Sequence, residues 1–308
     1  MATASNPHPS PNRGVLVPKH VRFALAVPAI LGGGPTTTSL DVTNRCNLTC
    51  AHCYYYAKPY EQDNLTDEEW VGFVRDHLLK EHPSVKMATY VGGEPMLRAG
   101  LIERLRRFFP FNWIVTNGTV PLPRWPWATL WFSVDGRESD HDKTRGEGTY
   151  RRTLGNIAAS DNRNFVHTTV TTLNMEGLSE MVTKLSGLPV GGVRFSAYTP
   201  MERMVDPLFP GREDAYRAIK GLKAEFGDFI LHTDDEIDHF RTGIAWGENC
   251  IMRDGTLSYS SKGELKGKCV MGDEMDCQRC GCTVPSYMYS ISRERSLSMV
   301  RLMWKTLA

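Results

Sequence analysis

The sequence lacks long hydrophobic runs, and no apolar stretch approaches the roughly 18 residues that a membrane-spanning helix requires. Its first residues, MATASNPHPSPNRG, also lack the basic-then-apolar order of a secretory signal peptide. They are instead rich in proline, serine and asparagine, which predicts a flexible leader over residues 1–35. We therefore expect a cytoplasmic protein with no membrane partner, whose thiols stay reduced.

The chain also lacks a surplus of charge of either sign. Lys and Arg total 36 and Asp and Glu total 35, so the formal net charge is +1 at pH 7. Such a chain has no general attraction to polyanions, and we expect no nucleic-acid partner. Its 308 residues are enough for one large hydrophobic core and a small appended domain.

Residues 36–241 alternate between short β-rich runs and amphipathic stretches, which is typical of an α/β fold with a parallel sheet. Thr66 and Glu69 have the spacing of a helix capping box. The predicted strands are 36–43, 85–91, 112–118, 129–136, 164–174 and 191–200, and the predicted helices are 66–82, 99–109, 149–160, 175–187 and 212–227.

The composition changes after residue 241 to glycine, cysteine, serine and lysine, so we expect a small separate domain over residues 242–290. The segment IMRDGTLSYS within it predicts a hairpin around an Asp-Gly turn. Residues 291–308 predict a final helix whose apolar residues recur at helical spacing, and we expect it to pack back on the core.

Three of the eight cysteines, Cys46, Cys50 and Cys53, follow the first predicted strand with the spacing C-x3-C-x2-C. Three thiolates on one loop can converge on a metal centre. A structural zinc ion needs a fourth ligand, and His52 is poorly suited because it adjoins Cys53. A [4Fe–4S] cluster held by three cysteines leaves one iron open to another ligand, so the spacing favours iron–sulfur over zinc.

This motif resembles the signature of the radical S-adenosylmethionine (radical SAM) superfamily, and the resemblance covers most of residues 36–282. It implies a partial (β/α)6 TIM-like barrel with its site at the carboxyl ends of the strands. It also implies that the open iron chelates S-adenosylmethionine, which is consumed to give a 5'-deoxyadenosyl radical that abstracts hydrogen from the substrate. The electron would come from a donor such as flavodoxin or ferredoxin.

The resemblance further suggests which residues contact S-adenosylmethionine. Ser133 is a candidate for the ribose and Arg145 for a carboxylate, of either the methionine moiety or the substrate. Tyr54 is expected near the cluster and the adenine. The segment GGEP is similar to the superfamily's glycine-rich segment that receives the methionine amino group, and consists of Gly92, Gly93, Glu94 and Pro95.

A second group, Cys269, Cys277, Cys280 and Cys282, has spacings of seven, two and one residues. A zinc ribbon is one interpretation of this spacing. Beside a radical SAM core, an auxiliary [4Fe–4S] cluster in a small twitch-type domain is favoured by the soft thiolate ligands. We therefore expect two [4Fe–4S] clusters in this protein.

Cys250 is then surplus, since a tetrathiolate site uses four of these five thiols. In many twitch-bearing relatives the cysteines before and after a hairpin are both ligands, which would use Cys250 and Cys269 and release a later one such as Cys282. Alternatively the last four form a self-sufficient set and Cys250 is free. We favour the second assignment because it closes no large loop.

A free neutral thiol can return a hydrogen atom to a carbon radical, because its S–H bond is weaker than a sugar C–H bond. The arrangement resembles the radical epimerases of aminoglycoside antibiotic biosynthesis, of the neomycin C to neomycin B type, in which Cys250 would be the hydrogen-atom donor. The alternatives are a radical SAM dehydrogenase of an aminosugar or aminocyclitol, a peptide-modifying twitch enzyme, and a zinc-bearing binding module without catalysis.

A polycationic aminoglycoside should meet carboxylates, and the segment HTDDEIDHF offers several at the expected end of a strand. A solvated acidic turn is an equal interpretation of this segment. The candidate substrate ligands are Asp234, Asp235, Glu236 and Asp238.

Overall fold

The computed structural model describes residues 35–55, 64–202, 206–243, 246–247, 250–267, 269–294 and 297–307. Its centre is a seven-stranded sheet in the order β6-β5-β4-β3-β2-β1-β7, and all neighbouring strands are parallel. The predicted leader lies outside the described residues, apart from Pro35. The strands are β1 Thr37–Thr43, β2 Met87–Gly92, β3 Phe111–Thr116, β4 Ala128–Ser133, β5 Arg163–Val170, β6 Val193–Ala197 and β7 Thr256–Tyr259.

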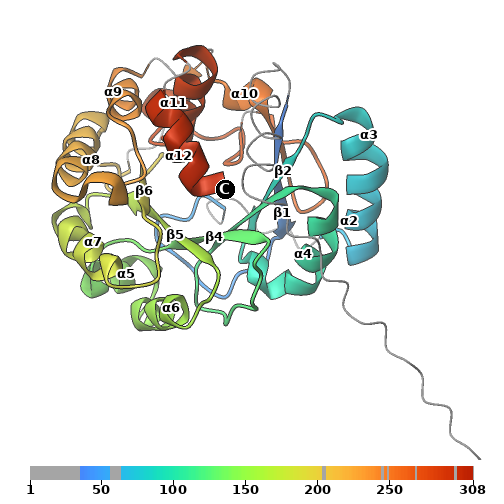
Figure 1. The fold of residues 1–308 in the computed structure, drawn as a ribbon, viewed down its shortest axis with the longest axis horizontal. Coiled ribbons are helices and arrows are strands. Elements are labelled where there is room, and N and C mark those ends of the chain that lie inside the picture. The colour runs from blue at the N-terminus through green and yellow to red at the C-terminus, as the bar shows by residue number, and fades with distance from the viewer. Residues whose placement is uncertain are drawn as a thin grey trace, which may run out of the picture.

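The helices surround the strands, with α2 to α4 on one side and α5 to α9 on the other (Figure 1). The predicted capping box is confirmed, since Glu69 N donates to Thr66 Oγ1 at 3.3 Å and Thr66 N donates to the Glu69 carboxylate at 2.7 Å. The helices are α2 Asp67–Phe73, α3 Leu79–Glu81, α4 Ala99–Leu105, α5 Glu138–Arg145, α6 Thr149–Ala158, α7 Leu178–Ser186, α8 Arg212–Phe226, α9 Asp234–Thr242, α10 Met252–Gly255, α11 Val284–Tyr289 and α12 Leu297–Leu307.

The six predicted strands and the five predicted helices of residues 36–241 are therefore present, in a TIM-like partial barrel. Helix α5 was not predicted, because its sequence ESDHDKTR carries no apolar stripe. Within the described part of the chain, no helix is both long and apolar enough to cross a membrane.

The two faces of the sheet bury different side chains. Residues such as Leu40, Tyr90 and Phe132 point outward and form one core with the surrounding helices. Alternate residues point inward, because successive strand residues face opposite sides. At the amino end the inward residues are apolar, and they are Met87, Phe111, Trp113, Trp131 and Phe165.

The last helix, α12, lies across this apolar end of the barrel (Figure 1). Leu302 packs on the inward aromatic residues, and Arg163 donates from its guanidinium to Thr306 O at 3.0 Å. The helix thus packs back on the core as expected, although Leu297 and Trp304 are 80% and 42% exposed. With that end covered, the polar inward residues lie toward the carboxyl ends of the strands.

The predicted hairpin around the Asp-Gly turn is wrong. Met252–Gly255 form the short helix α10, and β7 then pairs in parallel with β1, from Thr37 opposite Thr256 to Leu40 opposite Tyr259. This register puts Leu257 and Tyr259 against the outer core, which an isolated hairpin would leave in water. The cysteine-rich segment therefore shares the sheet of the barrel.

Candidate active site

The first cysteine group lies on the loop that leaves the carboxyl end of β1. Cys46, Cys50 and Cys53 are partly buried free thiols. The loop is held by its own backbone, since Cys53 N donates to Cys50 O at 3.1 Å and Ala51 N donates to Thr144 O at 2.8 Å. Three soft donors on one ordered loop are a suitable ligand set for an iron–sulfur cluster with one open iron.

The two glycines of the GGEP segment pack directly against the start of this loop. Gly92 has φ +115°, and a Cβ built on it would lie 2.3 Å from Thr43 O. A Cβ on Gly93 would lie 2.1 Å from Arg45 O. Only glycine permits this approach, which is fastened by Gly93 N donating to Thr43 O at 2.9 Å.

The carboxylate of Glu94 ties the end of β2 to the end of β3. It is buried and accepts from Met96 N at 2.9 Å, Thr116 Oγ1 at 2.8 Å and Asn117 N at 2.8 Å. Burial raises the pKa of Glu94, and these hydrogen bonds oppose the rise. Pro95 opens the following 3-10 turn, Pro95–Arg98. The side chain of Glu94 thus has a structural role, and contact of the segment with S-adenosylmethionine stays a prediction.

A Gly93→Ala variant should lose the first cluster. The added methyl would force the backbone at Arg45 and Cys46 to move by about 1 Å, because Cβ contacts below about 3 Å do not occur. We expect about four fewer iron atoms per chain after anaerobic reconstitution, measured by iron and sulfide analysis. In the matched control Gly100→Ala, the new Cβ meets nothing within 4 Å, and the iron content should equal that of the wild type.

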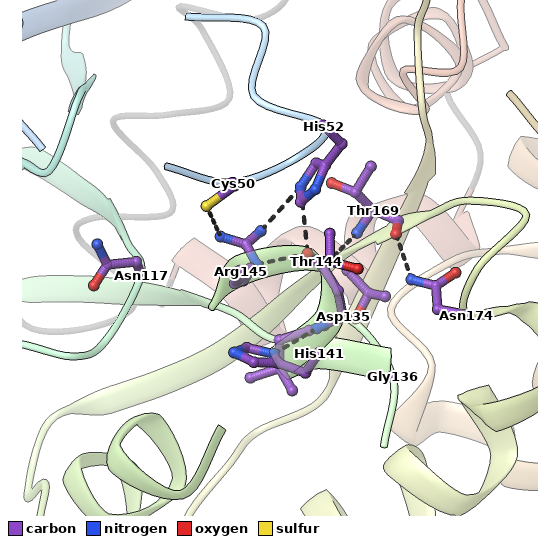
Figure 2. A network of polar contacts seen from close by, with 12 residues as sticks. Cys50, His52, Asn117, Asp135, Gly136, His141, Thr144, Arg145, Thr169 and Asn174 are labelled. Carbon is purple, nitrogen blue, oxygen red and sulfur yellow. Dashed lines mark hydrogen bonds and ion pairs between the residues drawn. The ribbon is translucent and has the colours of Figure 1, made fainter. Parts of the chain in front are cut away.

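A buried ion-pair network stands beside the first cysteine loop (Figure 2). Asp135, which follows β4, accepts from Arg145 Nε at 2.5 Å and from Thr169 N at 2.8 Å. His52 Nε2 lies 3.3 Å from the same carboxylate. Arg145, the last residue of α5, also places one guanidinium nitrogen 4.0 Å from Cys50 Sγ. The network thus positions an arginine cation against a cysteine of the motif.

The sequence interpretation gave Asp135 no role and considered His52 only as a zinc ligand, and the structure changes the expectation for Arg145. In the sequence, Asp135 and Gly136 form an Asp-Gly pair after a strand, which by itself indicates only a turn. Burial alone would raise the pKa of Asp135, but the charges of Arg145, His52 and His141 lower it to about 2. Arg145 is ion-paired through Nε, so only its terminal nitrogens face the loop and remain for any further anion.

An Asp135→Asn variant should lower the free energy of unfolding at pH 7 by about 3–5 kcal/mol, because Arg145 would remain buried without its partner. The folded-state pKa is about 2 and the ordinary value is 3.8, so this stabilisation is complete above about pH 4 and is lost as the pH falls toward 2. Urea unfolding curves at several pH values should show that the difference in unfolding free energy between the variant and the wild type becomes smaller as the pH falls from about 4 to about 2. Asp161→Asn, on an exposed residue, should change stability by less than about 0.5 kcal/mol.

Two other predicted contacts of S-adenosylmethionine occupy the inner side of the barrel. Ser133 is the last residue of β4, opposite His167 of β5. Burial raises the pKa of Tyr54, and the charges of Asp41, Cys53 and Cys269 act in the same direction. Contact of Ser133 and Tyr54 with S-adenosylmethionine stays a prediction.

The second cysteine group and Cys250 line a single cavity. Its wall also includes Thr199, Trp246 and Met275. The segment is anchored at the carboxyl end of β6, since Ala197 N donates to Gly281 O at 2.8 Å and Gly281 N donates to Thr199 Oγ1 at 2.9 Å. The five cysteines of this cavity are Cys250, Cys269, Cys277, Cys280 and Cys282.

Five thiols around one cavity fit a four-thiolate cluster with one thiol left over. Cys250 and Cys269 flank the stretch that contains α10 and β7, and both reach the cavity. Burial raises the pKa of the Cys250 thiol, which favours its neutral form. Both ligand assignments, with Cys250 or with a later cysteine as the spare thiol, stay open.

The acidic segment lies on a helix, so its predicted position at the end of a strand is wrong. Thr233 caps α9 by accepting from Glu236 N at 3.2 Å, and three acidic residues in the first turn favour a helix start. Glu236 is buried and ion-paired with Arg194 and His232. Asp234 and Asp238 pair with Lys220 of α8, and Asp235 is exposed.

Comparisons with known proteins agree with this geometry. Residues 40–185 match the sequence family described as the radical SAM superfamily. The sporulation killing factor maturation protein SkfB of Bacillus subtilis is 27% identical over 159 residues, which are 48% of this chain and 38% of SkfB.

Two solved structures share the fold at low sequence identity. Streptococcus suis SuiB bound to S-adenosylmethionine has a TM-score of 0.63 at 12% identity, with 85% of this chain and 68% of SuiB covered. The enzyme anSMEcpe with bound AdoMet has a TM-score of 0.62 at 17% identity, with 83% of this chain and 80% of that chain covered. The match over residues 40–185, which includes the cysteine loop after β1, identifies a radical SAM superfamily domain in this chain, and the two solved structures share its fold.

Proposed function

We propose that this protein is a radical SAM epimerase that inverts one sugar carbon of an aminoglycoside, in a reaction of the neomycin C to neomycin B type. The observation that supports this proposal is the cavity lined by five thiols, one more than a tetrathiolate cluster uses. The spare thiol, which we assign to Cys250, would donate a hydrogen atom to the substrate carbon from the face opposite to abstraction.

When bound, the first cluster and S-adenosylmethionine would supply the 5'-deoxyadenosyl radical that abstracts hydrogen. The auxiliary cluster would supply one electron to the thiyl radical that is left after hydrogen donation. The chain's own residues hold and shield the site. Gly92 and Gly93 bring β2 against the cysteine loop, and Asp135 holds Arg145 beside Cys50. Burial keeps the Cys250 thiol protonated, which is the form that can donate a hydrogen atom.

A second candidate is a peptide-modifying radical SAM enzyme, and the comparisons favour it over the first. SuiB has also been solved bound to its precursor peptide SuiA, with a TM-score of 0.58 over 94% of this chain. At 12% identity this similarity shows that the fold is shared, and an experiment is needed to determine the substrate class. No relative reported above is named as an aminoglycoside enzyme.

Anaerobically reconstituted protein offered neomycin C in deuterium oxide tests the proposal. Mass spectrometry should show 5'-deoxyadenosine together with an epimer that carries one solvent deuterium, because a thiol proton exchanges with water. An oxidised sugar without deuterium would indicate the dehydrogenase alternative. If the protein converted a cysteine-containing peptide and left the aminoglycoside unchanged, the epimerase proposal would be overturned in favour of the second candidate.

A further inference from the structure

Three buried polar side chains on the inner face of β1 and β7 have no hydrogen-bond partner for at least one atom among the described residues. They are Asp41, Ser39 and Ser258, with exposed fractions of 1%, 5% and 2%. The unpartnered atoms are Asp41 Oδ1 and the two serine hydroxyls. Ser39 lies directly opposite Ser258 in the parallel pair, and Asp41 is the next inward residue along β1. The three therefore form one continuous polar patch.

Burial of these unpartnered atoms lowers the free energy of unfolding of the protein without a ligand. A buried hydroxyl or carboxylate oxygen without a partner loses its hydration and gains nothing in return. Burial raises the pKa of Asp41 to about 6, even though Lys266 opposes the rise. Lys266 contacts the other carboxylate oxygen, Oδ2, and also donates to Val270 O at 2.9 Å. Among the described residues, Asp41 Oδ1 therefore has no hydrogen-bond partner.

The patch is connected to both cysteine groups. Asp41 lies on β1, which leads into the loop of Cys46, and Lys266 joins the Asp41 carboxylate to Val270 O, next to Cys269. The backbone of Lys266 is bonded to β7, since Lys266 N donates to Ser258 O at 2.7 Å. Lys266 thus links Asp41 of β1 to the end of β7, the strand that precedes Cys269. In the proposed reaction the substrate loses hydrogen near the first group and receives it near the second, so these side chains are candidates to contact it.

We propose that Asp41, Ser39 and Ser258 form a substrate subsite that receives an ammonium group and neighbouring hydroxyl groups of an aminosugar, an inference that rests on the proposed function. An ionised carboxylate oxygen only accepts hydrogen bonds, so its partner must be a donor. The two hydroxyls donate or accept, as sugar hydroxyls also do. An ammonium beside vicinal hydroxyls therefore satisfies all three side chains at once.

Binding of neomycin C to the anaerobically reconstituted protein, measured by isothermal titration calorimetry, tests this subsite. Ser39→Ala and Ser258→Ala should each weaken binding about three- to tenfold, because each removes one hydrogen bond. Asp41→Asn should weaken it by about 30-fold or more, because it removes a hydrogen bond to a charged group. The melting temperature of both serine variants should equal or exceed that of the wild type, since neither hydroxyl has a hydrogen-bond partner among the described residues.

Asp214→Asn is the matched control. Asp214 is an exposed residue of α8 that pairs with Arg217, so its loss should leave the affinity unchanged. Wild-type affinity in Ser39→Ala, Ser258→Ala and Asp41→Asn, with epimerisation intact, would overturn the subsite and leave the proposed function standing. A wild-type protein that neither binds nor converts any aminoglycoside would overturn both.

Discussion

A Cys250→Ala variant is expected to cleave S-adenosylmethionine at a rate close to that of the wild type and to form epimer at least about 100-fold more slowly. Cys250 lies in the cavity of the second cysteine group, away from the loop after β1, so its loss leaves the first motif intact. The substrate radical would then lack its hydrogen donor. Liquid chromatography with mass spectrometry should show 5'-deoxyadenosine without epimer, or with an oxidised sugar.

The iron content of this variant decides between the two assignments of the spare thiol. Unchanged iron with no epimer supports Cys250 as the donor. A loss of about four iron atoms per chain would make Cys250 a cluster ligand and move the donor role to a later cysteine such as Cys282. Normal epimer formation by Cys250→Ala would refute the donor role.

A Cys50→Ala variant should lose the cleavage of S-adenosylmethionine by at least about 1000-fold, which is the largest effect that we expect. Two thiolates cannot hold a cluster that three normally hold, so about four of roughly eight iron atoms per chain should be missing. The loss also removes the thiol that faces the guanidinium of Arg145. Iron analysis and the rate of 5'-deoxyadenosine formation measure the two effects.

Cys250→Ala is the natural control for this variant, because it removes one cysteine from the other group. If Cys50→Ala retained full iron and normal cleavage, the loop after β1 would not be the site of the first cluster. If both variants lost cleavage equally, a general failure of folding would be indicated, and circular dichroism would detect it.

Local patterns in the sequence were sufficient to predict most strands and helices of the barrel. Each predicted strand of residues 36–241 forms, because β-branched and aromatic runs bounded by turn residues act over short distances. The capping box at Thr66 forms for the same reason. Helix α5 was missed because its contacts are polar and tertiary, as the bond from Arg145 to Asp135 illustrates.

The segment after residue 241 was harder to predict, because its pairing partner is distant in the chain. An Asp-Gly pair predicts a hairpin from nearest neighbours. The actual partner of β7 is β1, more than 200 residues earlier, and the pairing buries Leu257 and Tyr259 on the outer core. Likewise, no local pattern in the sequence predicted that Glu236 is buried and ion-paired with Arg194.

The sequence by itself determined the two groups of cysteines and the resemblance to a radical SAM domain, because both depend on short spacings within one segment. Only the tertiary structure decided that Cys250 shares a cavity with the second group. It also decided that Asp41, Ser39 and Ser258 face inward, each with one atom that has no hydrogen-bond partner among the described residues. Both depend on strands brought together from opposite ends of the chain. Such contacts are selected by the burial of the whole core, which no window of neighbouring residues contains.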